Sequence, residues 1–361
     1  MILANHSVKD IELFKTAPDE SVVIFYHDKC FDGFVSLLTV YCALYGDSLD
    51  NGRSFNKPQL VASNYRAGKD CECLVENKVP YLKYGDQRIE LKDKIIFIVD
   101  YSLSPRVLAD IAKHAKHVVW VDHHVSAVNE YKEHILGTKM VDSSQPDNLT
   151  VMLSDDPLGK EECGASLVFN LLKPLIHLSK HFHLEKLVLL CKRWDLWLDN
   201  GHPDSDSTHA AYWFKSLDIN EDSLDTVLPD VVNFHTSFIE QVLNVGKHNL
   251  KHHLDVIEEY KKEHATTATL VISDMFFTIP FCKMPKTVHS LYGSQMAVKA
   301  PYVSMTYWEV SDGKYEYSIR SKAGNSITAL SIATQYGGGG HTDAAGFTSK
   351  LLPNELFLVR H

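Results

Sequence analysis

The stretch "VVIFYHDKCFDGF", residues 22–34, decides how the first part of the chain folds. Residues 22–26 form a short apolar run typical of a buried strand, and a helical pattern of apolar residues follows from 33 to 46. Between them lie His27, Asp28, Cys30 and Asp32. Buried strands usually end in turn residues, so this cluster of metal-binding side chains indicates a functional site.

The same alternation of strand and helix continues through the first half of the chain. Further strands are predicted at 59–63, 95–99 and 118–121, and a second helix at 104–116, where "SP" opens it. Short uninterrupted apolar strands that alternate with helices favour an α/β fold with a parallel sheet buried on both faces. Such a sheet binds ligands at the carboxyl ends of its strands.

The middle of the chain changes in character. The polar segment 140–160 is predicted to be a loop, and 161–199 to be mostly helical. A break follows at 200–210, and 227–263 is again predicted to be helical.

From residue 266 the pattern alternates as in antiparallel strands, in "TATLVISD", "YVSMTYWEV" and "KYEYSIRS". A helix is expected at about 325–335. We therefore predict an α/β domain over 1–215, a helical linker over 216–262, and a smaller α+β domain over 263–361.

Composition limits the function classes. The 361 residues are 45% hydrophobic and 23% charged, as in a soluble globular protein. There are 36 Lys and Arg against 46 Asp and Glu, a formal net charge of −10. This balance argues against a protein that coats long nucleic acid, although a local basic pocket for a short nucleotide remains compatible with it.

The cysteines and the N-terminus bear on location. Seven irregularly spaced cysteines fit a reducing compartment, and "CEC" at 71–73 lacks the spacing of a zinc site. The N-terminus lacks the pattern of a signal peptide, and no apolar run reaches the ~20 residues of a membrane span. We expect a cytoplasmic protein without membrane association.

Acidic and imidazole side chains follow three of the predicted strands. His27 and Asp32 come after the first, Asp100 after 95–99, and Asp122-His123-His124 after 118–121. Each alone is ambiguous, because an aspartate after a strand is often only a helix cap. Together they are expected to share one crevice, where carboxylates and imidazoles suit Mn²⁺ or Mg²⁺.

A second feature is "YGGGGHTDAAGF", residues 336–347. Four glycines in a row are interpreted as backbone that approaches a ligand, rather than as packing or as a linker. Successive N–H groups there can bind an anion, and Arg320 upstream suits phosphate oxygens.

Together these pieces resemble the DHH phosphoesterase family, in the subgroup whose C-terminal domain carries a GGGH loop and which includes oligoribonucleases of the nano-RNase kind. The matching segments are "HDKCFDG", "VDYS", "VDHHVS", "KRWDLW" and "SIRS…GGGGHTDAAGF". They extend over residues 22–347 in the family's order, which is nearly the whole chain.

The resemblance implies two Mn²⁺ ions, with Mg²⁺ or Co²⁺ as alternatives, in a cleft between the two domains. His27 and Asp100 would bind one ion, and Asp32, Asp100, His123 and Asp195 the other. Asp122 would orient ligands, and His124 would lie near the substrate phosphate. Arg320 and the loop Gly338, Gly339, Gly340 and His341 would hold the nucleotide. The "CGAS" segment at 163–166 resembles a family segment behind the site and is interpreted as structural.

Cys30 departs from the family, which usually has an aspartate there as a ligand of the first metal. A thiol suits Mn²⁺ poorly unless the metal deprotonates it. Cys30 therefore either coordinates as a thiolate or leaves that ion with fewer protein ligands.

The predicted activity is a Mn²⁺-dependent phosphodiesterase for short oligonucleotides or for dinucleotides, including cyclic ones. One alternative is a phosphatase for small nucleotides such as 3′-phosphoadenosine phosphate. Another is a nucleotide-binding sensor with reduced turnover through Cys30. Neither duplex nucleic acid nor a membrane is an expected partner, and a homodimer is left open.

Overall fold

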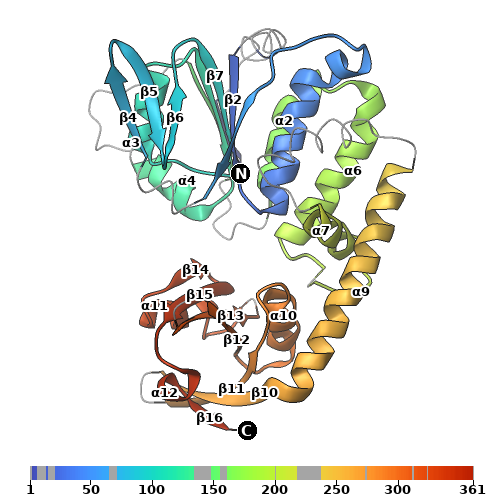
Figure 1. The fold of residues 1–361 in the computed structure, drawn as a ribbon, viewed down its shortest axis with the longest axis vertical. Coiled ribbons are helices and arrows are strands. Elements are labelled where there is room, and N and C mark those ends of the chain that lie inside the picture. The colour runs from blue at the N-terminus through green and yellow to red at the C-terminus, as the bar shows by residue number, and fades with distance from the viewer. Residues whose placement is uncertain are drawn as a thin grey trace. The chain divides into compact units, whose positions relative to one another are not determined.

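The computed structural model describes residues 2–5, 14, 21–64, 71–133, 148–154, 161–199, 201–217, 237–272, 275–310, 313–322 and 324–360. The chain divides into two compact units (Figure 1). The first comprises Met1–Leu198 and His209–Gly246, and the second Asp199–Thr208 and Lys247–His361. The role of each predicted domain stays a prediction.

The first unit is built on a six-stranded sheet in the order β1-β9-β8-β7-β2-β3. Every neighbouring pair is parallel except β1 and β9. The strands are β1 (Ile2–Asn5), β2 (Ser21–His27), β3 (Gln59–Ser63), β7 (Lys94–Val99), β8 (His117–Asp122) and β9 (Leu149–Ser154). All four strands predicted for this half are present, and the predicted parallel α/β sheet is confirmed.

Both faces of this sheet are covered, which explains why its strands are continuous apolar runs. One face packs against α2 (Phe31–Asp50), α5 (Gly164–Leu172) and α6 (Leu178–Asp195). The other packs against α3 (Pro105–Ala112), α4 (Val125–Tyr131) and a small antiparallel sheet. That sheet consists of β4 (Glu72–Glu76), β5 (Val79–Tyr84) and β6 (Gln87–Glu90), which the sequence patterns did not predict.

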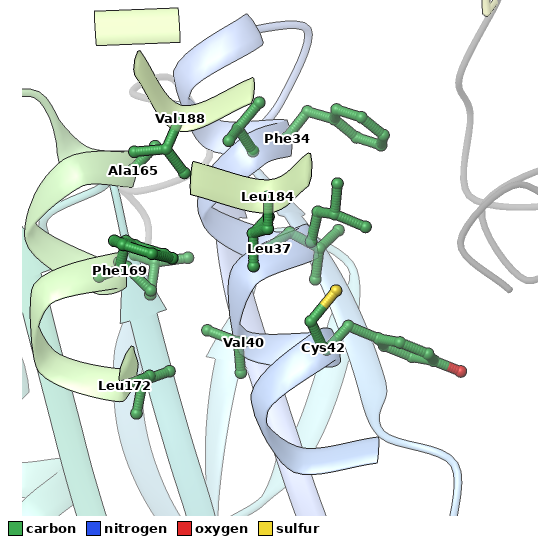
Figure 2. Close-up of a cluster of buried hydrophobic side chains, with 14 of the residues drawn as sticks. Phe34, Leu37, Val40, Cys42, Ala165, Phe169, Leu172, Leu184 and Val188 are labelled. Carbon is green, nitrogen blue, oxygen red and sulfur yellow. The ribbon is translucent and has the colours of Figure 1, made fainter. Parts of the chain in front are cut away.

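Helix α2 follows β2 directly and is buried along most of its length. Figure 2 shows Leu37 and Val40 of α2 among side chains of two further helices, including Phe169 of α5 and Leu184 of α6. Burying one such side chain contributes about 1.5–3 kcal/mol. This packing holds the start of α2, and with it Asp32, at the end of the sheet.

The prediction of a loop over 140–160 is wrong for the part that the structure describes. Residues 149–154 form β9, a completely buried strand beside β8. Its short sequence, "LTVMLS", is flanked by polar residues that obscured the apolar run. Residues 140–147 and 155–160 lie outside the described residues.

The second unit contains a mixed seven-stranded sheet in the order β14-β15-β13-β12-β11-β10-β16. Its strands are β10 (Ala265–Ile272), β11 (Met275–Lys283), β12 (Val303–Val310), β13 (Lys314–Ser321), β14 (Gly339–His341), β15 (Ala344–Ser349) and β16 (Leu358–Arg360). All pairs are antiparallel except β11 and β12. The predicted α+β character of this part is confirmed.

Two described helices in and around the second unit, α9 (Phe238–His264) and α11 (Ala329–Gln335), match helices predicted from the sequence. Helix α11 packs on the core face of the sheet, and α10 (His289–Lys299), which was not predicted, contacts β12 and β13. The other helices in the described part of the chain are η4 (Lys173–Leu175) of the first unit, α7 (Asp206–Ser216) and α12 (Pro353–Leu356). Of the predicted helix 227–263, residues 227–236 lie outside the described part of the chain.

Among the described helices, none combines the length and the apolar character needed to cross a bilayer.

Candidate metal centre

The carboxyl ends of three neighbouring strands carry the core of the candidate metal centre. Strands β8, β7 and β2 lie side by side, and they lead into Asp122–His124, Asp100 and His27. Asp100 has a left-handed backbone conformation with φ of 52°, which aspartate and asparagine adopt more readily than most residues. Because the strands are parallel, all these side chains meet at one edge of the sheet.

Asp100 lies at the middle of this group. Its Oδ1 is 3.4 Å from Nε2 of His123, and its Oδ2 is 3.4 Å from Nδ1 of His27. Both oxygens are buried, and neither has a hydrogen-bond partner among the described residues. Burial disfavours the carboxylate, but His123 and His27 outweigh it and lower the pKa of Asp100. One carboxylate thus faces two separate imidazoles.

Three carboxylates surround Nε2 of His123. Besides Asp100, Oδ2 of Asp32 lies 3.5 Å away and Oδ2 of Asp195 lies 3.6 Å away. Burial lowers the pKa of His123, but Asp195 and Asp100 outweigh it and raise the pKa to about 10. Burial, with the neighbouring charge of Asp100, raises the pKa of Asp32 well above its usual value. Carboxylates gathered this closely repel one another unless a proton or a cation lies among them.

The donor set fits divalent cations in two adjacent clusters. Asp32, Asp100 and His123 each offer a ligand atom, all within 4.8 Å of one another, and so do His27, Asp100 and His124. Two atoms that each lie about 2.1 Å from one cation are roughly 3 Å apart, close to the observed separations. Asp100 belongs to both clusters, as expected of a bridging ligand.

Helix α5 holds Asp32 in place. The backbone N–H of Gly164 donates to Asp32 Oδ2 at 2.6 Å, and that of Ala165 donates to Oδ1 at 2.8 Å. A Cβ on Gly164 would lie 2.7 Å from Cβ of Asp100 and 3.0 Å from Oδ2 of Asp32. Sequence reasoning interpreted this segment as structural only, whereas it directly contacts two of the predicted ligands. A glycine near the start of a predicted helical segment was the sequence feature that could have indicated this close approach.

His124 is oriented by a chain of hydrogen bonds. Its Nδ1 lies 2.6 Å from Oδ1 of the completely buried Asp122. Ser102 donates its hydroxyl to Asp122 Oδ2 and accepts the indole N–H of Trp120 at 3.1 Å. Burial by itself would raise the pKa of Asp122 and lower that of His124. The interaction between the two side chains outweighs burial, so the pKa of Asp122 is lowered and that of His124 is raised. Ser102 was also missed, although it lies in the "VDYS" segment.

Cys30 lies just before α2 and belongs to neither cluster. Burial, followed by the negative charges of Asp100, Asp195 and Asp32, raises the pKa of its thiol well above the usual value. Without a metal the sulfur is therefore protonated. Its predicted role as a ligand stays a prediction.

A different charged group lies in the second unit. Arg320 of β13 donates from Nη1 to Ser318 Oγ and the carbonyl of Ile319, and from Nη2 to Ser290 Oγ. Among the described residues no carboxylate pairs with it, and partial desolvation lowers its pKa to about 10. A half-buried guanidinium whose hydrogen-bond partners are all neutral is suited to an anionic ligand.

The glycine run is more ordered than a loop that only approaches a ligand. Gly339–His341 forms β14 against β15. A Cβ on Gly338 would lie 2.1 Å from the carbonyl oxygen of Gly346, and one on Gly340 would lie 2.6 Å from that of Ala344. The interpretation that these glycines serve no packing is therefore wrong for Gly338 and Gly340, whereas Gly339 has open space.

The clustered carboxylates and imidazoles at the end of a parallel α/β sheet define a candidate divalent-metal centre. No family model matches the chain, and no curated protein matches it. Among solved structures, an exopolyphosphatase-related protein from Bacteroides fragilis has a TM-score of 0.50 and 13% identity, over 96% of this chain and 92% of that one.

Two other solved structures are similar at lower TM-scores. RecJ from Thermus thermophilus, in complex with Mn²⁺, has a TM-score of 0.47 and 13% identity over 97% of this chain. This chain spans about half of RecJ, 52% of its length. The pGpG-specific phosphodiesterase PggH from Vibrio cholerae has a TM-score of 0.48 and 12% identity, over 91% of this chain and 93% of that one.

The likeness to the Bacteroides fragilis protein shows a shared fold over nearly the full length of both chains. The fold that the DHH motifs predicted, a parallel-sheet domain followed by a smaller α+β domain, is confirmed.

Proposed function

We propose that the chain is a DHH-type phosphodiesterase that uses two divalent cations to hydrolyse short oligonucleotides or dinucleotides. One observation carries the proposal: both buried oxygens of Asp100 lack hydrogen-bond partners among the described residues, and each faces a different imidazole. An ionised carboxylate in that position is costly unless cations bind it.

The proposed ligands are those that the resemblance implies, and all of them except Asp195 belong to the two clusters. His27 and Asp100 would hold one cation, and Asp32, Asp100, His123 and Asp195 would hold the second. When bound, the cations would supply the charge that lowers the pKa of a water and stabilises the phosphoryl oxygens. Mn²⁺ suits this mixed set of carboxylates and imidazoles, and Mg²⁺ or Co²⁺ are alternatives.

The remaining side chains bind and orient the substrate. Asp122 holds Nδ1 of His124, so that Nε2 is available to a phosphate oxygen. In the second unit, Arg320 and Gly339 line one depression, where Arg320 provides positive charge for a phosphate. The neighbouring glycines and His341 complete the proposed nucleotide site. Its position between the two domains and a cytoplasmic location remain predictions.

The negative net charge of the chain favours small substrates over long nucleic acids. The net charge of −10 opposes the binding of long polyanions, because such binding relies on many Lys and Arg contacts. A small nucleotide needs only local positive charge, which the metal centre and Arg320 provide. The proposal therefore covers short RNA, short DNA and cyclic dinucleotides.

The test is a substrate panel with a metal titration. Dinucleotides, five-nucleotide RNA and DNA, cyclic dinucleotides and 3′-phosphoadenosine phosphate are each incubated with Mn²⁺, Mg²⁺ or Co²⁺, and products are separated by chromatography. We expect mononucleotides to be released from the short oligonucleotides. Release of inorganic phosphate from 3′-phosphoadenosine phosphate alone would favour the phosphatase instead.

Asp100→Asn is the sharpest variant, because asparagine also tolerates the positive φ and nearly preserves the side-chain shape. Hydrolysis should fall by more than about 100-fold, since even partners of metal ligands cost about 10- to 100-fold. Asp93→Asn is the matched control, an exposed aspartate with φ of 59° that should remain fully active. Nucleotide binding without cleavage in the unaltered protein would instead support the sensor.

A further inference from the structure

A depression of about 290 Å³ lies on one face of the second unit's sheet. Its lining includes Trp308, Glu316, Ser318, Arg320, Gly339 and Thr348. Alternate residues of β13 point to opposite faces of the sheet. Tyr317 and Ile319 belong to the hydrophobic core, so the opposite face carries Glu316, Ser318 and Arg320 in a row.

An aromatic side chain lies beside this row. Trp308 of β12 is directly opposite Glu316 in the strand register. Cross-strand neighbours of this kind have Cβ atoms about 5 Å apart. The ring of His289 contacts the indole with centroids 4.2 Å apart. The indole Nε1 of Trp308 is buried and has no hydrogen-bond partner among the described residues.

We propose that this depression is a guanine-nucleotide subsite. Trp308 stacks on the base, Glu316 binds its Watson–Crick edge, and Arg320 binds a phosphate. The proposal rests on the proposed function and deepens it, because it selects guanine-containing dinucleotides and oligonucleotides among the substrates. Glu316 and Trp308 are then the residues that determine base specificity.

The chemistry of the base edges favours guanine. The ring N–H at N1 and the amino group at N2 of guanine are adjacent donors, and a carboxylate accepts both at once. Adenine presents an acceptor at N1 next to its single amino group, so a carboxylate gains at most one hydrogen bond and repels the ring nitrogen. Stacking on Trp308 is independent of the base and supplies affinity rather than selectivity.

The spacing of the charges suits one nucleotide. Glu316 and Arg320 are four residues apart on the same strand, about 13 Å along it. Both side chains line the same depression, so they reach a ligand from opposite ends. Lys286 lies 4.0 Å from Glu316, a loose and solvated contact that leaves the carboxylate able to accept hydrogen bonds.

The test measures nucleotide binding separately from hydrolysis. The full-length protein is titrated with GMP and with AMP by calorimetry in the presence of EDTA, where no turnover occurs. We expect GMP to bind about tenfold more tightly, the discrimination of one bidentate contact. Glu316→Gln should abolish this preference, and Trp308→Leu should weaken the binding of both nucleotides by about tenfold.

Glu309→Gln is the matched control, because Glu309 follows Trp308 on β12 but does not line the depression. Circular dichroism confirms that each variant is folded, and Glu316→Asp provides a second variant that should keep part of the preference. Equal affinities for GMP and AMP, no binding of either, or a preference that survives in Glu316→Gln would overturn the subsite.

Measurements of hydrolysis then distinguish the guanine subsite from the proposed phosphodiesterase activity. With Mn²⁺, the ratio of kcat/KM for GpG over ApA should fall toward one in Glu316→Gln. Equal cleavage of both dinucleotides by the unaltered protein refutes the subsite but leaves the phosphodiesterase intact. Selective GMP binding without cleavage of any substrate refutes the phosphodiesterase but leaves the subsite.

Discussion

Replacing Gly164 with alanine should weaken the metal centre rather than the fold. The new Cβ would lie 2.7 Å from Cβ of Asp100, 2.9 Å from its Oδ1 and 3.0 Å from Oδ2 of Asp32. The first contact is about 0.7 Å closer than the shortest ordinary contact of 3.4 Å. Either α5 or the two carboxylates must therefore move.

The size of that movement determines how much Mn²⁺ affinity and hydrolysis should fall. Metal sites tolerate deviations of only about 0.2 Å in ligand distances, so a shift of several tenths displaces both carboxylates from the cations. We expect Mn²⁺ affinity and hydrolysis to fall by about 10- to 100-fold. Overpacking costs about 1–3 kcal/mol of stability, and about 1 kcal/mol is regained because alanine is the better helix former.

Two measurements test this reasoning. Mn²⁺ affinity is measured by isothermal titration calorimetry, and the free energy of unfolding by urea denaturation with EDTA and with saturating Mn²⁺. The stabilisation by Mn²⁺ should shrink in Gly164→Ala, while stability in EDTA changes by no more than about 2 kcal/mol. A variant that binds Mn²⁺ normally and is more stable than the original would show that helix propensity alone governs this position.

Three further predictions concern the orientation of His124, metal coordination at position 30, and packing of the glycine run. Ser102→Ala leaves Asp122 Oδ2 without a hydrogen-bond donor, so we expect the free energy of unfolding in urea to fall by about 1–3 kcal/mol. We also expect a lower kcat with little change in Mn²⁺ affinity. Ser102→Thr keeps the hydroxyl and should restore kcat if the orientation of His124 is the reason. Cys30→Asp supplies a hard oxygen ligand and should tighten Mn²⁺ binding about tenfold by calorimetry, and unchanged affinity would exclude position 30 from the metal site. Gly338→Ala places a Cβ 2.1 Å from a backbone oxygen and should lower stability by about 1–3 kcal/mol or more in thermal unfolding. In contrast, Gly339→Ala meets nothing within 4 Å and should be nearly neutral, so equal effects would contradict the packing argument.

Local sequence was sufficient for the fold class and for much of the candidate site. The apolar runs and helical patterns that surround His27, Asp100 and His123 are short-range features, and a parallel sheet brings its strand ends to one edge whatever the rest of the chain does. The strand β9 was not predicted, because its six residues are buried by elements distant in sequence while its sequence neighbours are polar. The resemblance, rather than any pattern around it, identified Asp195.

What the sequence determined by itself was the alternation of elements and the meeting of acidic and imidazole side chains at the strand ends. Only the tertiary structure decided which atoms face one another. It placed the N–H groups of α5 on Asp32 across more than 130 residues of chain, left the half-buried Arg320 without a carboxylate partner among the described residues, and aligned Trp308 with Glu316. Periodicity reports which face of an element is buried, whereas these contacts depend on the register and packing of elements that are distant in sequence.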